Sequence, residues 1–167
     1  MAFFREGYNC SQSVVLAFSD IIGLGEEELS KLSCGLGGGV GRMREVCGTV
    51  TGMAMVAGFL TEKAGSRPAN KADGAKDGNG ADEATGPAAL HHAQKHACYA
   101  LVQELSDKFK SDNGSIVCRE LLGLRAAGKQ NPEPAERNGH YYRTRPCEQL
   151  VGYAAALLAE KISGISL

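Results

Sequence analysis

The chain has 167 residues, of which 43% are hydrophobic and 6% aromatic, and its formal net charge is −1 at pH 7. This length suffices for one domain with a substantial core, so residues 1–167 are predicted to form a single domain. A net charge near zero argues against the large basic surface of a nucleic-acid-binding protein, and the absence of Trp together with the scarcity of aromatic residues weakens the case for base stacking. No stretch approaches the roughly 18 apolar residues of a membrane span, so membrane insertion is not expected.

The N-terminus and the cysteine content indicate a reducing compartment. Residues 1–6 pass from Met1 into charged residues without the apolar segment of a signal peptide, which makes the cytoplasm the expected location. Disulfides are rare there. The six cysteines are therefore interpreted as metal ligands or redox thiols rather than as structural disulfides.

Helical patterns of hydrophobic residues run through most of the chain, and no segment shows the sustained alternation typical of a strand. The predicted fold class is all-α, a single-domain compact bundle of about five to six helices. The third helix is apolar on most sides and is expected to be central and buried. The expected helices cover residues 10–22, 26–33, 43–63, 88–110 and 147–162, with a short one at Cys118.

Three segments between the helices have the composition of loops. Residues 34–41 are so rich in glycine that no regular element would tolerate them. Residues 64–87 contain almost no apolar side chain larger than Ala, so burial cannot offset the entropy of ordering them, and a long flexible linker is predicted. Residues 126–142 are polar and contain prolines, and they are expected to form a loop.

Four widely spaced cysteines dominate the functional interpretation, because three of them fall where a helix is predicted to begin. Unpaired backbone N–H groups and the positive end of the helix dipole favour a thiolate there and lower its pKa. Such placement indicates redox or metal chemistry at sulfur. The candidate cofactor-binding residues and metal ligands are Cys10, Cys47, Cys118 and Cys147.

The residues around the first two cysteines set their expected surroundings. Asn9 and the Gln three residues later form a capping-box pair, which places Cys10 at the first helical position. Cys47 is expected inside a helix instead. Gly48 and Gly52 follow it, so one face of that helix lacks side-chain bulk and another backbone or a cofactor can approach closely.

The other two cysteines follow different capping signals. Ser115 is expected as an N-cap, which places Cys118 at the third helical position. Pro146 suits the first helical position, which places Cys147 at the second. Both sulfurs are therefore expected near free backbone N–H groups.

Four thiolates that converge in one pocket would repel one another, so a cation must offset them. Iron in a cluster takes four cysteine thiolates, and zinc takes the same set in a tetrahedral site. A protein that exchanges thiols and disulfides without metal remains the alternative, since it needs only a nucleophilic and a resolving cysteine. Nearby cations expected to stabilise negative charge on a cluster are Arg42, Arg44, Arg119 and Arg145.

Five motifs resemble those of the redox-active proteins named for their C, GCAxxG, C, C cysteine pattern, in the same order and over almost the whole chain. Thr49 stands where that pattern usually has Ala, and Cys34 and Cys98 do not match its four cysteines. The motifs are residues 7–14 (GYNCSQSV), 37–43 (GGGVGRM), 47–52 (CGTVTG), 118–123 (CRELLG) and Cys147.

The resemblance implies an all-helical fold in which four cysteines converge. A related domain fused to a cytochrome is thought to carry an iron–sulfur cluster, which makes such a cluster the leading cofactor, with 2Fe-2S favoured over 4Fe-4S. The expected function is electron transfer by a redox-active protein that is either an electron carrier or an oxidoreductase. The alternatives are a metal-free thiol–disulfide protein and a zinc-binding or other metal-binding module. A redox partner protein of unknown identity is expected, and homodimer formation is left open.

Weaker features remain. His91, His92 and His96 lie near Cys98 on a predicted helix and are interpreted as solvent-facing rather than as metal ligands. The glycine-rich loop before Arg42 either holds an anion or lets the chain turn tightly beside the cysteines. Side chains expected at the pocket or at the core edge are Tyr8, Tyr141 and Tyr142.

Overall fold

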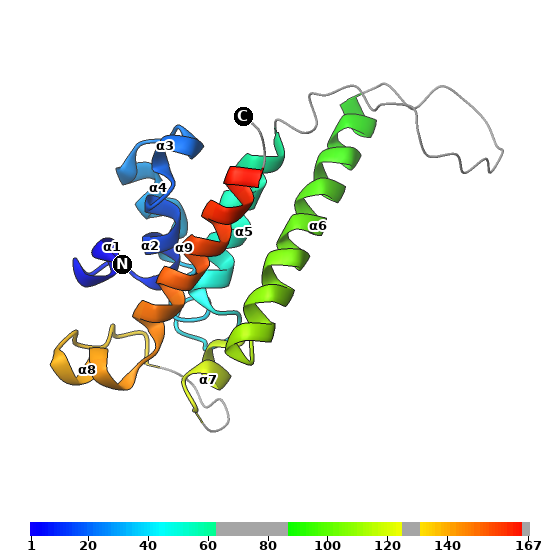
Figure 1. The fold of residues 1–167 in the computed structure, drawn as a ribbon. Coiled ribbons are helices and arrows are strands. Elements are labelled where there is room, and N and C mark those ends of the chain that lie inside the picture. Colours follow the sequence, from blue (N-terminus) through cyan, green and yellow to red (C-terminus); the bar gives the residue numbers. More distant parts are fainter. Residues whose placement is uncertain (63–86, 125–130, 165–167) are drawn as a thin grey trace.

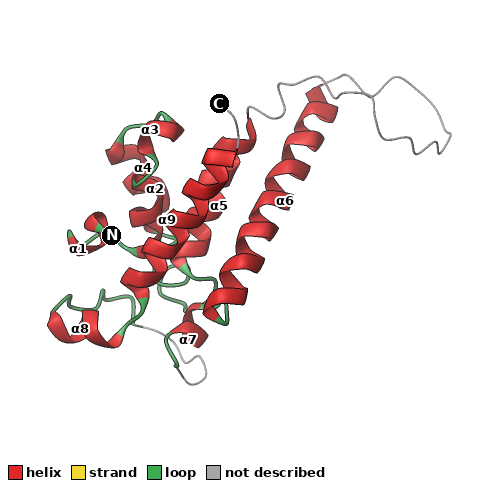
Figure 2. Ribbon diagram, in the orientation of Figure 1, coloured by secondary structure: helices red, strands yellow, loops and turns green. Residues whose placement is uncertain are grey.

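The computed structural model describes residues 1–62, 87–124 and 131–164. Helices are the regular elements of this part of the chain, and Figure 2 shows helices joined by loops, so the all-α prediction is confirmed. The helices are α1 (Ala2–Arg5), α2 (Cys10–Leu16), α3 (Ser19–Ile22), α4 (Glu26–Cys34), α5 (Gly48–Glu62), α6 (Pro87–Asn113), α7 (Cys118–Leu121), α8 (Gly139–Thr144) and α9 (Cys147–Gly164).

Helix α5 is the centre of the molecule, as its apolar sequence predicts. It packs against α2 on one side and against α6 and α9 on others, and α6, α5 and α9 run alongside one another in Figure 1. Burial of large aliphatic and aromatic side chains between these helices supplies the main stabilisation. Fully buried members of this core include Phe4, Val14, Val15, Met53, Val56, Phe109, Val151 and Leu158.

Small residues let α2 and α5 approach closely, which was the expectation for the glycines after Cys47. A Cβ atom placed on Gly48 would lie 3.0 Å from the Cβ of Cys10, and one placed on Gly52 would lie 2.9 Å from the Cβ of Val14. Both distances are shorter than ordinary contacts between carbon atoms. The backbone of α2 therefore occupies the space that side chains at these positions would need.

Several predicted helix boundaries are wrong. The predicted helix 10–22 is two helices, because Phe18 leaves the helical conformation with φ −125° and ψ 24°. The predicted helix 43–63 begins only at Gly48, since Arg44 has a φ of +65° and cannot continue a right-handed helix. Short helices α1 and α8 were not predicted, and α8 begins inside the expected loop 126–142 and ends beyond it.

The predicted linker falls almost wholly on residues 63–86, which lie outside the described residues. Its last residue, Pro87, is the first residue of α6, a position where a missing N–H costs nothing. None of the described helices is long and apolar enough to cross a membrane.

Candidate functional site

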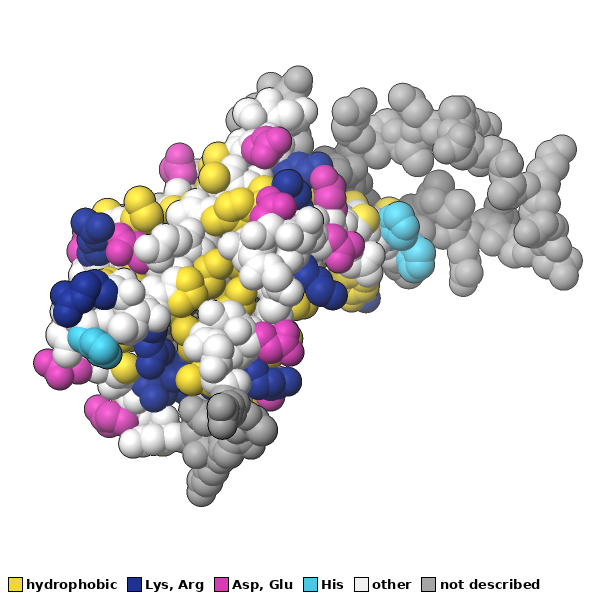
Figure 3. Space-filling view, turned by 60° about the horizontal axis from the view of Figure 1, so that its bottom comes forward, with side chains coloured by type: hydrophobic (Ala, Val, Ile, Leu, Met, Phe, Trp, Pro, Cys, Tyr) yellow, Lys and Arg dark blue, Asp and Glu magenta, His cyan; other side chains and the backbone are white. Residues whose placement is uncertain are grey.

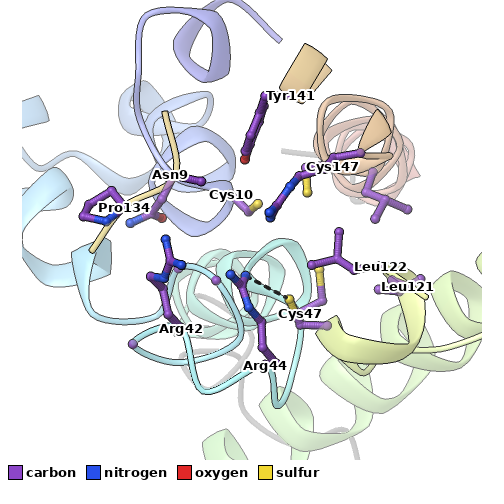
Figure 4. Close-up of a pocket in the computed structure, with 18 of the residues that line it drawn as sticks. Asn9, Cys10, Arg42, Arg44, Cys47, Leu121, Leu122, Pro134, Tyr141 and Cys147 are labelled. Carbon is purple, nitrogen blue, oxygen red and sulfur yellow. Dashed lines mark hydrogen bonds between the residues drawn. The ribbon is translucent and has the colours of Figure 1, made fainter. Parts of the chain in front are cut away.

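The four candidate cysteines line one cavity of about 370 Å³ (Figure 4). Each comes from a different part of the fold, and all four side chains are buried. In Figure 1, α5 and α9 both begin at the end of the molecule where α7 and α8 lie, and this end carries the cavity. Residues far apart in the chain thus meet at a single site.

All four cysteines sit where a helix begins, including the one expected inside a helix. Cys10 is the first residue of α2, and Cys47 directly precedes α5. Cys118 is the first residue of α7 rather than the third, because Val117 and not Ser115 is the N-cap. Cys147 is the first residue of α9, one position earlier than predicted.

The start of α2 shows the predicted capping box. The Asn9 side chain accepts hydrogen bonds from the backbone N–H groups of Ser11 and Gln12, and the Gln12 side chain accepts one from the Asn9 backbone. The Asn9 amide also donates to the carbonyl of Cys34 at the end of α4, over 2.9 Å. The capping residue therefore fixes Cys10 relative to a second helix.

A short antiparallel pairing brings Cys47 and Cys118 together. Val46 and Val117 form an isolated bridge, in which the Cys47 N–H donates to the Ile116 carbonyl over 2.8 Å. The Cys118 N–H donates to the Glu45 carbonyl over 2.6 Å. These bonds hold the segment before α5 against the segment before α7, so both sulfurs reach the same cavity.

The glycine-rich loop takes an unusual path beside the cysteines. Residues 38–42 are consecutive left-handed residues with φ between 54° and 76°, and Arg44 follows with φ +65°. A Cβ atom on Gly39 would lie 2.7 Å from the Cβ of Cys118, so only glycine lets the loop pass there. Figure 4 shows the guanidinium groups of Arg42 and Arg44 turned toward the cavity by this path.

Burial opposes ionisation at two of the thiols. It raises the pKa of Cys47 to about 11, although the Thr49 hydroxyl lies 3.0 Å from the sulfur and favours the thiolate. Burial also raises the pKa of Cys118 against the effect of Arg44, whose Nη1 lies 4.0 Å from that sulfur. The prediction that a helix start lowers the pKa is therefore wrong at Cys118, because loss of solvent dominates.

Cys10 and Cys147 form a hydrogen-bonded pair with opposite pKa shifts. Hydrogen bonding to Cys147, and then burial, raise the pKa of Cys10 well above its ordinary value. The same hydrogen bond lowers the pKa of Cys147 to about 7, with further help from Arg145 and Arg44. Of the four thiols, Cys147 is thus the one that ionises most readily, as expected for a helix start.

The cavity is strongly basic. Four arginines line it, while Asp and Glu are missing from its described lining. Burial, Arg44 and Arg145 lower the pKa of Arg42, a sign that these cations lie close together. Arg119, which the sequence also placed near the site, instead pairs with Glu45 outside the lining over 2.7 Å. The lining cations are Arg42, Arg44, Arg137 and Arg145.

Two lining residues were missed or undervalued by sequence reasoning. Arg137 donates to the carbonyls of Phe4 and Tyr8 and lies 4.2 Å from the centre of the Phe4 ring. Tyr141 projects its hydroxyl into the cavity in Figure 4, and burial raises its pKa to about 12. Asn138, whose side chain caps α8, was the local signal that could have revealed the short helix that positions both.

The other residues that the sequence analysis singled out lie in different surroundings. Cys34 is exposed yet contributes to the edge of the cavity, whereas half-buried Cys98 on α6 is not among its lining residues. The three histidines near Cys98 are exposed, which agrees with the solvent-facing interpretation. Tyr8 and Tyr142 pack at the edge of the core, as expected.

The donor chemistry of the cavity is compatible with a thiolate-bound metal cluster. Four thiols and four cations face a shared space, so negative charge on a bound group would be compensated. Zinc needs four sulfurs at about 2.3 Å from one centre. In the described part of the chain, His, Cys, Asp and Glu side chains form no group of three or more placed to hold a metal ion.

Comparison with protein families agrees with this arrangement. The family model described as "Putative redox-active protein (C_GCAxxG_C_C)" matches residues 8–161. The chain belongs to this family. No curated protein and no solved structure matched the chain in the same comparisons. The four candidate cysteines lie within the matched residues and line the cavity, and the protein shares the family's redox-active description.

Proposed function

We propose that the protein is an electron-transfer protein whose four cavity cysteines hold an iron–sulfur cluster, with 2Fe-2S favoured over 4Fe-4S. The observation that carries this proposal is the convergence of four buried thiols from four separate segments on one cavity of about 370 Å³. Dithiol chemistry needs only two of them. A cluster held there would accept and return single electrons. The ligands would be Cys10, Cys47, Cys118 and Cys147.

The charges around the cavity support the same proposal. Two thiolates 4 Å apart repel by about 4 kcal/mol at an effective dielectric constant of 20, so four ionised cysteines require compensation. Arg44 lies beside Cys118, and Arg145 and Arg44 both favour the thiolate of Cys147. The arginines would therefore stabilise the thiolate form of the four cysteine ligands against protonation.

Anaerobic purification tests the cluster directly. The protein should be brown, contain iron and acid-labile sulfide, and lose visible absorption when dithionite is added. Replacement of any one of the four ligands by Ser should abolish or greatly weaken this absorption. Cys98→Ser is the matched control, since this side chain is not among the lining residues, and it should leave the colour unchanged. Protein that stays colourless after reconstitution with iron and sulfide would exclude the cluster.

A specific observation also favours thiol–disulfide exchange as a second candidate. Cys10 and Cys147 are hydrogen-bonded, and the pKa of Cys147 is lowered to about 7, as suits a nucleophile with an adjacent resolving thiol. In that function the Cys147 thiolate attacks one sulfur of an external disulfide, whose S–S bond breaks, so that a mixed disulfide forms and the first product leaves as a thiolate. Cys10 then displaces the second product thiol and forms the Cys10–Cys147 bond. Metal-free protein that reduces a disulfide substrate stoichiometrically and loses this ability in Cys10→Ser would support it.

A further inference from the structure

Two guanidinium groups at the cavity carry hydrogen-bond donors that the protein does not use. The Nε atoms of Arg42 and Arg44 are buried, and neither has a hydrogen-bond partner in the described structure. The whole Arg44 side chain is only 7% exposed. A buried charged donor without an acceptor is costly, and such groups in native proteins call for a specific explanation.

The other two cavity arginines are already engaged. Arg137 donates to two backbone carbonyls at the end of α1 and beyond it, over 2.5 and 2.8 Å. The guanidinium of Arg145 lies 4.9 Å from the centre of the Tyr141 ring, within cation–π distance. Arg42 and Arg44 remain, and both side chains point into the cavity from the same loop (Figure 4). Arg44 also donates through Nη1 to the Cys118 sulfur over 4.0 Å, so the donors left without an acceptor are its Nε and the Nε of Arg42.

A guanidinium offers its Nε–H and a neighbouring Nη–H side by side, a geometry that matches two oxygens of a carboxylate or of another oxyanion. We propose that Arg42 and Arg44 bind a small oxyanion inside the cavity, next to the cysteines. The binding site stands on the two arginines. It rests on the proposed function only in that the anion would be the small molecule brought to the redox centre.

The walls of the cavity indicate two sources of this oxyanion. Leu121, Leu122 and Pro134 face the same space, and an apolar wall of this kind suits the hydrocarbon part of an organic carboxylate. An inorganic oxyanion would use the arginines alone. Figure 3 looks onto the end of the molecule with α7 and α8 and shows basic side chains next to hydrophobic and acidic ones there.

Calorimetric titration with four probes tests the proposal: phosphate, sulfate, acetate and butyrate. The titrations use the full chain in two forms, anaerobically reconstituted with iron and sulfide, and reduced without metal. Wild-type protein should bind at least one probe in both forms. Tighter binding of butyrate than of acetate identifies an organic carboxylate, whereas tighter binding of phosphate or sulfate identifies an inorganic ligand.

Variants assign the binding to the two arginines. Arg42→Gln and Arg44→Gln should each weaken binding by about tenfold or more, since each removes a charge-assisted hydrogen bond. The control is Arg143→Gln, which makes the same charge change at an exposed position of α8 outside the lining. It should bind like wild type. Because Arg44 is buried, circular dichroism is used to check that Arg44→Gln still folds. Arg42 is half-buried, and Arg42→Lys retains the positive charge while it removes the planar pair of donors.

Three results would overturn the proposal. One is the absence of binding for all four probes, and another is binding that Arg42→Gln, Arg42→Lys and Arg44→Gln leave unchanged. The third is binding to metal-free protein that disappears on reconstitution, which would mean that the arginines only neutralise the cluster. Failure of the proposed function is distinguishable from these results, since a colourless protein that still binds the probes loses the cluster and keeps the anion site.

Discussion

At the scale of single residues, Cys147 is the thiol whose chemistry is set most sharply by its neighbours. In reduced protein without metal, iodoacetamide should label Cys147 before the other buried cysteines, because the thiolate is the reactive form and its pKa is about 7. The labelling rate should rise with pH and reach half of its maximum near pH 7. Mass spectrometry of labelled peptides measures the rate at each cysteine.

The background and the control for this labelling follow from burial. Exposed Cys34 and half-buried Cys98 are first replaced by Ser, so that only the buried cysteines remain. In Cys10→Ala the hydrogen bond to Cys147 is lost, so the pKa of Cys147 should rise and the labelling curve should move to higher pH. Cys47, with a pKa of about 11, should stay unlabelled at neutral pH. Equal rates at Cys47 and Cys147 would contradict the assigned hydrogen bond.

Arg42 has a strained backbone conformation, although its side chain lines the cavity. It has a φ of +64°, a conformation that favours glycine and costs other residues on the order of 1 kcal/mol or more. Arg42→Gly should therefore raise the free energy of unfolding by about 1 kcal/mol, since relief of this strain exceeds the entropy gained by the unfolded chain. Urea denaturation of metal-free protein measures it. A lower stability in the variant would show that packing of the arginine stem outweighs the strain.

At the scale of elements, the contact between α2 and α5 determines how close the first two cysteines lie. Gly52→Ala should destabilise the protein by about 1–3 kcal/mol, because the added methyl group would lie 2.9 Å from the Cβ of Val14. Gly58→Ala is the control on the same helix. Its methyl group would meet nothing within 4 Å, so it should stabilise the helix by up to about 1 kcal/mol. Thermal unfolding compares the two, and equal effects would argue against close packing of the helices.

Element starts that depend on neighbouring residues could be predicted from the sequence, and those that depend on distant residues could not. Asn9 and Gln12 lie next to Cys10, so the capping box was predictable and is present. Cys47 lies in a segment that was expected to be helical, but its backbone is held by Ile116, a residue 69 positions away. Local periodicity contains no signal for such a bond.

The residues of the cavity likewise include some that could be predicted from the sequence and some that could not. Convergence of the four cysteines was implied by the family resemblance, and the structure brings them together. The contribution of Arg137 was missed, because the sequence around it was interpreted as a loop and the capping signal of Asn138 was not used. Left-handed conformations at Arg42 and Arg44 also carry no sequence signal, since residues of this type seldom adopt them.

At the scale of the whole molecule, the hydrophobic core extends well beyond the cavity. The core lies among α2, α5, α6 and α9, and it shares Cys10, Cys47, Cys147 and Leu150 with the cavity lining at the end where α5 and α9 begin. Removal of a bound cofactor should therefore leave the far-ultraviolet circular dichroism almost unchanged while it lowers the melting temperature by several degrees, because a ligand stabilises only the folded state. Loss of most helical signal on metal removal would mean that the cofactor is needed for the core itself.

Val46 precedes residues 63–86 in the chain and Val117 follows them. The β-bridge between these two residues therefore joins the two parts of the chain that flank this segment. Each part contributes two of the cysteines, Cys10 and Cys47 before this segment and Cys118 and Cys147 after it. Neither fragment alone could then assemble the four-sulfur site. If the proposed cluster is bound, two fragments expressed separately and mixed would form a complementation pair, in which the appearance of colour reports that the two halves have associated.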